Sequence, residues 1–276
     1  MSPFEIAGSN TDTDFITRPV SLSRGPSIGA AQSWRKAESW KALDALGRRA
    51  LFEQALDTLW LAFQPIVSLS HPDEPAFAFE ALARNGEVLV SDPRDLLALA
   101  VSIGMVGDLG RVVHARAAEA LRRDPDLTLF VNVDVEELMG SLGDDQDALS
   151  EFASRVVLEV TERAPISELP EVRQRSSALR DQGYRFAIDD LGGGYAGLSS
   201  LALMDPQFVK IDQALIRDVD TQPIKRKIVG SLAALARQLG IGCIVEGVET
   251  EGERDTLLAL ECDLMQGYLF GRPGPL

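Results

Sequence analysis

The chain has 276 residues, of which 45% are hydrophobic and 25% are charged, and its formal net charge is -15 at pH 7. This composition is typical of a globular protein with an ample core, and the length suits one large domain such as a barrel. The negative charge disfavours a nucleic-acid polymer or an anionic membrane as partner, but it is compatible with a small phosphate ligand if divalent cations reverse the local charge.

The few cysteines and histidines, together with the hydropathy of the chain, indicate which cellular compartment and which class of metal to expect. Cys243 and Cys262 are the only cysteines and His71 and His114 the only histidines, so a zinc site built from these residue types is disfavoured. No apolar run reaches the ~20 residues of a membrane span, and no secretory signal opens the chain. We therefore expect a cytoplasmic protein with reduced thiols and no membrane partner.

Residues 1–29 mix Ser, Thr, Gly, Asp and Pro without hydrophobic periodicity, which predicts a disordered tail. Residues 30–60 are expected to form an N-terminal helical segment, with one amphipathic helix from Trp34 to Ala50 and a second helix from Leu51. Trp34 and Trp40 form an apolar stripe that either docks a protein partner or packs against the domain. The general rule that apolar stripes belong to the core favours packing.

Residues 61–276 alternate strand-like and helical segments. The predicted strands are Ala62–Leu69, Ala76–Leu82, Leu127–Val133, Val156–Thr161, Arg185–Asp190, Phe208–Asp212, Gly242–Val248 and Asp263–Phe270. The predicted helices between them include Arg94–Val101, Gly110–Arg123, Leu169–Gln182, Ile224–Leu239 and Glu251–Leu260. The first two strands are joined by only Ser70–Pro75, which is too short for a crossover helix, so this pair must be antiparallel. The pattern predicts an α/β fold, a modified (β/α)8 barrel with one antiparallel strand.

Polar side chains end nearly every predicted strand, where a barrel enzyme carries its chemistry. They are Glu80, Asn132, Glu159, Glu162, Asp189, Asp190, Lys210, Glu246, Glu249 and Gln266. Any one of them alone is explained as a surface acid or an ion pair, but together they indicate one shared site. Asp189 and Asp190 are adjacent, and the pleat of a strand is expected to send them to different sides of the sheet.

The chemical type of these residues narrows the reaction. Oxygen ligands without His or Cys select hard cations such as Mg²⁺, Mn²⁺ or Ca²⁺. Four or more carboxylates and an amide are better used by two ions that share an Asp, an arrangement suited to attack on a phosphodiester. Lys210 would orient the attacking water or serve as a structural counter-ion, and Arg84 is expected to hold a phosphate oxygen.

Spaced motifs along the chain resemble those of the EAL domain, the cyclic di-GMP phosphodiesterase family named for the triplet Glu80-Ala81-Leu82. In order, they are Gln64-Pro65-Ile66-Val67 and the segments VNV, E-x-T-E, DD-x-G-x-GY, KID, EGVET and QGYLFGRP. The resemblance runs from about Leu51 to the C-terminus. It implies hydrolysis of cyclic di-GMP to linear pGpG with two Mg²⁺ or Mn²⁺ ions, inhibition by Ca²⁺, and a homodimer.

The resemblance also implies roles for individual residues. The implied metal ligands are Glu80, Asn132, Glu159, Asp189, Asp190 and Glu246. Glu80, Asp190, Lys210 and Glu246 are the implied catalytic residues, with Lys210 positioning the water and Glu246 acting on it as a base or supporting acid. The implied nucleotide contacts are Gln64, Leu82, Arg84, Asp212, Glu249, Gln266, Tyr268, Arg272 and Pro273. Glu162 is similar to the acid that anchors the loop after Asp190.

That loop departs from the family pattern. Leu191, Gly193, Ala196 and Gly197 stand where the family usually has Phe, Thr and two Ser. Added glycines lose more entropy on ordering, so the altered loop is expected to slow turnover while binding survives. An active phosphodiesterase is the favoured hypothesis. The alternative is a weak or inactive domain that acts as a cyclic di-GMP receptor, and a barrel enzyme for some other phosphodiester is a third hypothesis.

Overall fold

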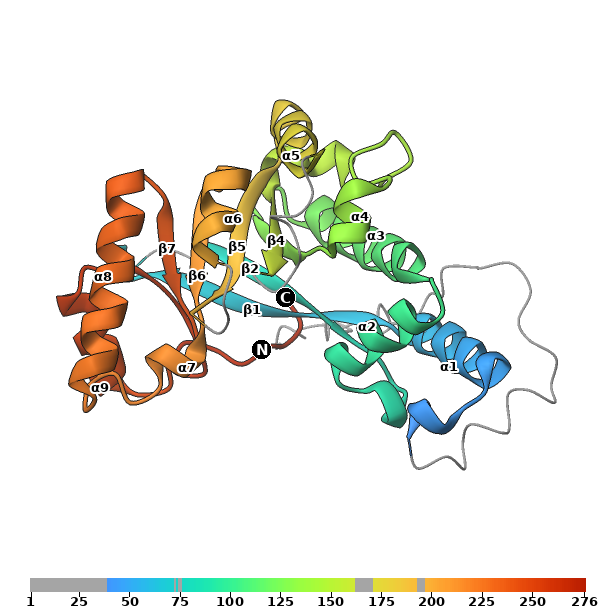
Figure 1. The fold of residues 1–276 in the computed structure, drawn as a ribbon, viewed down its shortest axis with the longest axis horizontal. Coiled ribbons are helices and arrows are strands. Elements are labelled where there is room, and N and C mark those ends of the chain that lie inside the picture. The colour runs from blue at the N-terminus through green and yellow to red at the C-terminus, as the bar shows by residue number, and fades with distance from the viewer. Residues whose placement is uncertain (1–38, 72, 74–75, 162–170, 193–196) are drawn as a thin grey trace, which may run out of the picture.

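The computed structural model describes residues 39–71, 73, 76–161, 171–192 and 197–276. Eight strands close into a barrel in chain order (Figure 1). The strands are β1 (Trp60–Ser68), β2 (Ala78–Arg84), β3 (Leu129–Asn132), β4 (Val156–Thr161), β5 (Arg185–Leu191), β6 (Phe208–Ile211), β7 (Gly242–Val245) and β8 (Leu264–Gln266). The predicted disordered tail, residues 1–29, and the predicted loop anchor Glu162 lie outside the described residues.

One strand is reversed. β1 is antiparallel to both of its neighbours, β2 and β8, whereas the other neighbouring strands are parallel. In the β1–β2 pair, Gln64 lies opposite Glu80. The pairing of the first two strands therefore places two predicted site residues side by side. The α/β barrel predicted from strands that alternate with helices is confirmed, and so is the antiparallel pairing predicted from the short β1–β2 connection.

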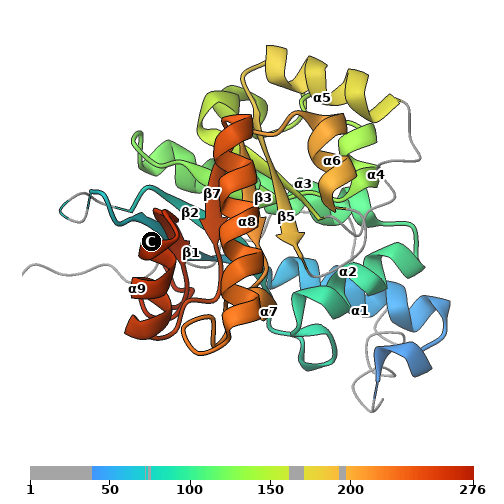
Figure 2. The same cartoon turned by 60° about the vertical axis from the view of Figure 1, so that its left-hand side comes forward.

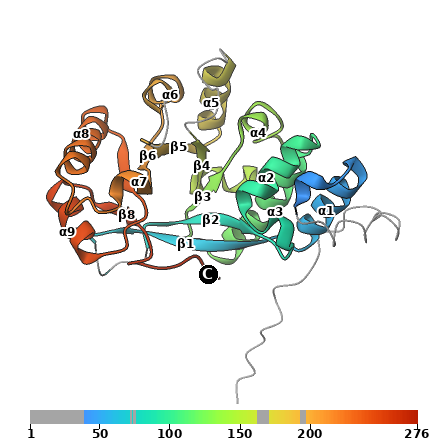
Figure 3. The same ribbon diagram turned by 60° about the horizontal axis from the view of Figure 1, so that its bottom comes forward.

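Helices cover the outside of the barrel. They are α1 (Ala45–Asp57), α2 (Pro93–Ser102), α3 (Val106–Arg123), α4 (Val135–Met139), α5 (Glu171–Asp181), α6 (Gly197–Met204), α7 (Gln213–Ile216), α8 (Pro223–Leu239) and α9 (Glu251–Ala259). In Figure 2, α8 lies in front of β7, and in Figure 3 the long strands β1 and β2 run along the side opposite α5 and α6. None of the helices in the described ranges is long and apolar enough to cross a membrane.

The segment before the barrel differs from the predicted pair of helices. A short 3-10 turn at Trp40–Ala42 is followed by α1, which continues through Ala50 without the predicted break. Asp44 sets the new helix start, because its Oδ1 accepts a hydrogen bond from the Gly47 N–H at 2.8 Å. Trp40 is only 6% exposed and packs in the core, so it is not available to a partner. Trp34 lies outside the described residues.

The barrel interior is filled by one apolar side chain from every strand. These residues form a single cluster consisting of Ile66, Ala78, Phe130, Val157, Ala187, Phe208, Ile244 and Leu264. Phe130 and Phe208 meet edge to face, with ring centroids 5.3 Å apart. This layer closes the barrel as a packed core, so ligands can enter only at its ends.

Candidate active site

A ring of polar side chains lies directly above the apolar layer, at the C-terminal ends of the parallel strands. Side chains two residues apart on a strand point to the same face of the sheet. On each strand, the residue two positions from the interior apolar residue, in the direction of the barrel mouth, is therefore also turned inward, and it is polar. In strand order the ring consists of Gln64, Glu80, Asn132, Glu159, Asp189, Lys210, Glu246 and Gln266. The predicted convergence of polar strand ends on one barrel mouth therefore has a simple structural origin.

Lys210, from β6, lies among four carboxylates. Its Nζ is 2.6 Å from Glu246 Oε1, 2.7 Å from Glu159 Oε1, 3.1 Å from Glu80 Oε2 and 3.6 Å from Asp189 Oδ1. The side chains of Lys210 and Glu159 are 0% exposed. Four acids facing one ammonium group leave an excess of negative charge in a buried place. Such an excess favours the binding of divalent cations.

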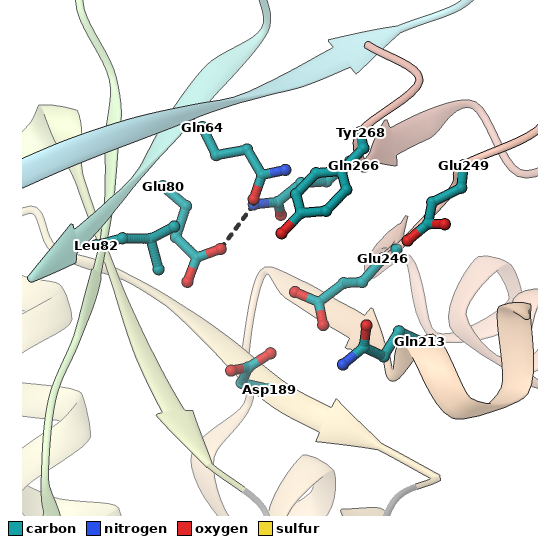
Figure 4. Close-up of a pocket in the computed structure, with 11 residues that line it drawn as sticks. Gln64, Glu80, Leu82, Asp189, Gln213, Glu246, Glu249, Gln266 and Tyr268 are labelled. Atoms are coloured by element: carbon teal, nitrogen blue, oxygen red, sulfur yellow. Dashed lines mark hydrogen bonds between the residues drawn. The ribbon is translucent and has the colours of Figure 1, made fainter. Parts of the chain in front are cut away.

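Amide side chains fix the orientation of Glu80. Asn132 Nδ2 donates to Glu80 Oε1 at 3.0 Å. Gln266 Nε2 donates to Glu80 Oε2 at 2.7 Å, the bond that is dashed in Figure 4. Gln266 Nε2 also lies 3.2 Å from Gln64 Oε1, and Gln64 Nε2 donates to the Gly271 carbonyl at 3.1 Å. Glu80 is thus held by donors from both sides of the ring and has little rotational freedom.

The acids of the ring differ in the direction in which their pKa values are shifted. Burial raises the pKa of Glu159 well above its ordinary value, the charge of Glu80 adds to this, and Lys210 offsets only part of it. Burial likewise raises the pKa of Asp189, and that of Glu246 to about 8. For Glu80, burial is outweighed by the Lys210 charge and the donated hydrogen bonds, so its pKa is lowered. Lys210 itself is held charged, because the surrounding carboxylates outweigh the effect of burial and raise its pKa.

Asp189 and Asp190 lie on the same side, contrary to the expectation from strand pleating. The β5–β6 register shifts between Ile188 and Leu191, which marks a bulge, and Asp190 adopts a left-handed φ of 60°. A bulge re-aims side chains that regular alternation would separate. As a result, Asp189, Asp190 and Glu246 each present an oxygen within 4.8 Å of the other two.

This donor set fits a hard divalent cation. It consists of the carboxylate oxygens of Asp189, Asp190 and Glu246, and such oxygens are the ligands that Mg²⁺, Mn²⁺ and Ca²⁺ prefer. Glu159 Oε2 is buried and accepts no hydrogen bond from any described residue, although buried polar atoms are normally satisfied. Such an oxygen is explained if a cation is its partner.

A pocket of about 340 Å³ opens above the ring (Figure 4). Its lining residues are Gln64, Glu80, Leu82, Asp189, Gln213, Glu246, Gly247, Glu249, Gln266, Gly267 and Tyr268. Five residues expected to contact a nucleotide are therefore on its wall, namely Gln64, Leu82, Glu249, Gln266 and Tyr268. Glu159 and Lys210 are not among the lining residues, but Lys210 contacts the lining acids Glu80, Asp189 and Glu246.

Other residues expected to contact a nucleotide are not on this wall. Arg84 Nη1 donates to its neighbouring Ala83 carbonyl at 2.8 Å, and Asp212 caps α7 by accepting from the Ala214 N–H at 2.7 Å. Arg272 stacks over the Tyr268 ring, with its guanidinium carbon 4.2 Å from the ring centroid. Pro273 follows Arg272 in the C-terminal segment that pairs with β1. Their nucleotide contacts stay predictions.

Three lining residues escaped the sequence analysis. Gln213 is the first residue of α7, directly after the KID segment, and this polar position at a strand end was the available signal. Gly247 and Gly267 line the pocket with backbone. Gly247 has a φ of 68°, and a Cβ on Gly267 would lie 2.1 Å from the Val248 carbonyl oxygen, so both positions require glycine.

Comparisons with known proteins agree with this geometry. The model of the EAL domain family matches residues 48–273. The cyclic di-GMP phosphodiesterase RocR of Pseudomonas aeruginosa is 38% identical over 130 residues, which cover 46% of this chain and 33% of RocR. The chain spans about a third of the length of the curated relatives it matches, from 24% to 36% in four of them.

Solved structures share the fold. The PaMucR phosphodiesterase in its c-di-GMP complex superposes with a TM-score of 0.74 at 30% identity, over 83% of this chain and 98% of that one. Klebsiella pneumoniae BlrP1 superposes with a TM-score of 0.69 at 30% identity, over 79% of this chain and 56% of that one. BlrP1 was solved as cy-diGMP complexes with calcium and with manganese.

Proposed function

This chain belongs to the EAL domain family, and from that premise we propose that it hydrolyses cyclic di-GMP to linear pGpG at the mouth of its barrel. One observation carries the proposal: four carboxylates of the ring lie within 3.6 Å of the buried Lys210 ammonium group, next to a pocket of about 340 Å³. The similarity to named cyclic di-GMP phosphodiesterases supports the choice of substrate.

The residues of the ring have different proposed roles in the reaction. We assign Glu80, Asn132, Glu159, Asp189, Asp190 and Glu246 as the residues that would hold two Mg²⁺ or Mn²⁺ ions. When bound, the ions would supply charge neutralisation at the phosphodiester and a water of lowered pKa for in-line attack. Gln266 holds Glu80 in place by donating a hydrogen bond to it, and the same Gln266 amide group donates to Gln64.

Lys210 and Glu246 would act on the attacking water. The Lys210 ammonium group is held charged by its acidic neighbours and is placed to orient that water. Glu246 Oε1 lies 2.6 Å from Lys210 Nζ and faces the pocket, so Glu246 is the group placed to accept the proton of the water. Leu82 and Tyr268 give the wall of the pocket apolar surface on which a base can pack.

Incubation of the purified chain with cyclic di-GMP and Mg²⁺ or Mn²⁺, followed by chromatography, tests this function. We expect pGpG with at least one of the two ions, and complete loss of product in Glu80→Ala, since that change removes a proposed metal ligand that is also one of the four carboxylate partners of Lys210. Glu151→Ala, an exposed acid away from the pocket, is the matched control and should retain activity. Absence of pGpG under both ions would contradict the proposal.

A cyclic di-GMP receptor is the second candidate, favoured by the substitutions at Leu191, Gly193, Ala196 and Gly197. The described part of that loop retains Gly192 at a φ of 100°, where a Cβ would meet Leu215 at 2.4 Å, and Leu191 is buried. Residues 193–196 lie outside the described residues. Titration calorimetry discriminates, because a receptor would bind cyclic di-GMP tightly without metal and without product. The expected homodimer and a protein partner stay predictions.

A further inference from the structure

Arg217 and Glu249 form an ion pair at the edge of the pocket. Arg217 Nη2 donates to Glu249 Oε1 at 2.5 Å, and Arg217 Nη1 pairs with Glu249 Oε2. Glu249 lines the pocket (Figure 4), whereas Arg217 is not among the lining residues. A forked pair of this kind fixes the plane of a carboxylate as well as its charge.

The backbone that carries Glu249 is already fixed by its neighbours. The Val248 N–H donates to the Gln266 carbonyl at 3.1 Å, and the Leu269 N–H donates to the Val248 carbonyl at 3.1 Å. The Glu249 N–H donates to Glu253 Oε2 at 2.9 Å. Only the side-chain torsions of Glu249 remain free, and the pairing with Arg217 removes that freedom.

The backbone that carries Arg217 is held by the same residue. Glu253 is 2% exposed, and its Oε1 accepts from the Asp218 N–H at 3.0 Å. Lys225 Nζ donates to the Arg217 carbonyl at 2.6 Å. The ion pair therefore joins two segments whose backbones are tied through one buried glutamate, so the position of the Glu249 carboxylate is defined relative to the pocket.

Stability alone does not explain this arrangement. The side chains of Arg217 and Glu249 are 41% and 37% exposed, and ion pairs with such exposure contribute little to folding. The hydrogen bond from Arg217 lowers the pKa of Glu249, so this carboxylate stays an ionised acceptor. Its position on the wall gives that acceptor a use in binding.

We propose that Arg217 is a positioning residue for substrate binding, which holds the Glu249 carboxylate to accept hydrogen bonds from the N–H groups on a guanine edge of cyclic di-GMP. The inference rests on the proposed function. An ionised carboxylate accepts but cannot donate, and guanine offers N–H donors, whereas the phosphates of the substrate offer none. Arg217 thereby contributes to recognition of the base and leaves the metal-binding ring unchanged.

Calorimetric titration of cyclic di-GMP into the full chain and its variants tests this inference. Arg217→Ala should weaken binding about tenfold, as expected for loss of one coupled charge pair. Arg217→Lys, which keeps the charge without the fork, should recover part of the loss. In Glu249→Gln, the further change Arg217→Ala should have no additional effect. Arg237→Ala is the matched control, because Arg237 forms an exposed pair with Glu261 away from the pocket.

Two further readouts separate positioning from general damage. The affinity for Mn²⁺ and the unfolding temperature should match those of Arg237→Ala, since neither depends on Glu249. Unchanged or tighter cyclic di-GMP binding in Arg217→Ala would overturn the inference, as would a parallel loss of Mn²⁺ affinity. If the unaltered chain binds no cyclic di-GMP, the proposed function fails and the inference fails with it, whereas binding that is insensitive to Arg217 overturns the inference alone.

Discussion

Single residues decide the character of the barrel mouth. Phe208 lies in the apolar layer and Lys210, two positions on, lies among the acids; Val157 and Glu159 repeat the pattern on β4. The resulting ring holds more negative charge than Lys210 can neutralise. Burial, and after it the neighbouring carboxylates, raise the pKa values of Glu159, Asp189 and Glu246. Under the proposed function, this excess of buried negative charge destabilises the metal-free protein and favours the binding of cations.

Replacement of Glu159 by Gln tests whether this buried charge lowers the stability of the metal-free protein and raises its affinity for cations. The Gln side chain has the same shape as Glu and can still turn its oxygen toward Lys210. It carries no negative charge, however, and that charge is disfavoured at this position by burial and by the nearby Glu80 carboxylate. In EDTA, Glu159→Gln should unfold at the same temperature as the unaltered chain or at a higher one. Its affinity for Mn²⁺ should fall about tenfold or more, in the range seen when the residues around a metal are altered.

Thermal melts in EDTA and calorimetric Mn²⁺ titrations give both values. Glu151→Gln is the control, because Glu151 is an exposed acid whose loss should change neither. A strongly destabilised Glu159→Gln with normal Mn²⁺ affinity would mean that Glu159 is only a structural partner of Lys210.

The accuracy of the sequence predictions differs between the helices and strands of the fold. Val156–Thr161 was predicted to the residue, since a buried strand with clear ends is readable from sequence. The short helices α4, α6 and α7 were not predicted, because four to eight residues show too little periodicity. The helix boundary at Asp44 was missed because the apolar spacing runs through it, and only the cap reveals the start.

The candidate site was more predictable than the helices. Acids at strand ends are visible in the sequence, and barrel topology brings such ends together. The bulge that turns Asp189 and Asp190 to one side was not predictable, because it depends on the pairing of β5 with β6. The pairing of Arg217 with Glu249 was likewise hidden, since 32 residues separate them in the chain.

At the scale of elements, the segment after β8 packs directly on the segment after β7. A Cβ on Gly267 would lie 2.1 Å from the Val248 oxygen and 2.3 Å from its nitrogen. Gly267→Ala must therefore push the backbone between Glu246 and Glu249 away, and we expect it to lower the free energy of unfolding by about 3 kcal/mol. Denaturant unfolding measures this loss.

Gly107→Ala provides the comparison. Gly107 lies in α3, and nothing lies within 4 Å of an added Cβ. Because Ala favours a helix more than Gly does, this variant should be as stable as the unaltered chain or slightly more stable. Equal stability of the Gly267 and Gly107 variants would show that the contact between the two segments is not tight.

At the scale of the whole molecule, the barrel brings together proposed metal ligands that are far apart in the chain. Glu80 and Glu246 come from β2 and from the end of β7, and each contacts Lys210 from β6. Only closure of the barrel brings them together, so joint occupancy of this mouth by metal and cyclic di-GMP is the central claim of the proposed function.

Native mass spectrometry of the full chain with Ca²⁺ and cyclic di-GMP tests that claim most directly, because Ca²⁺ is expected to support binding without turnover. The predicted complex contains one cyclic di-GMP and two metal ions per chain, and Asp189→Asn should lose at least one ion. A complex of cyclic di-GMP without metal, or an ion count that Asp189→Asn leaves unchanged, would contradict the account.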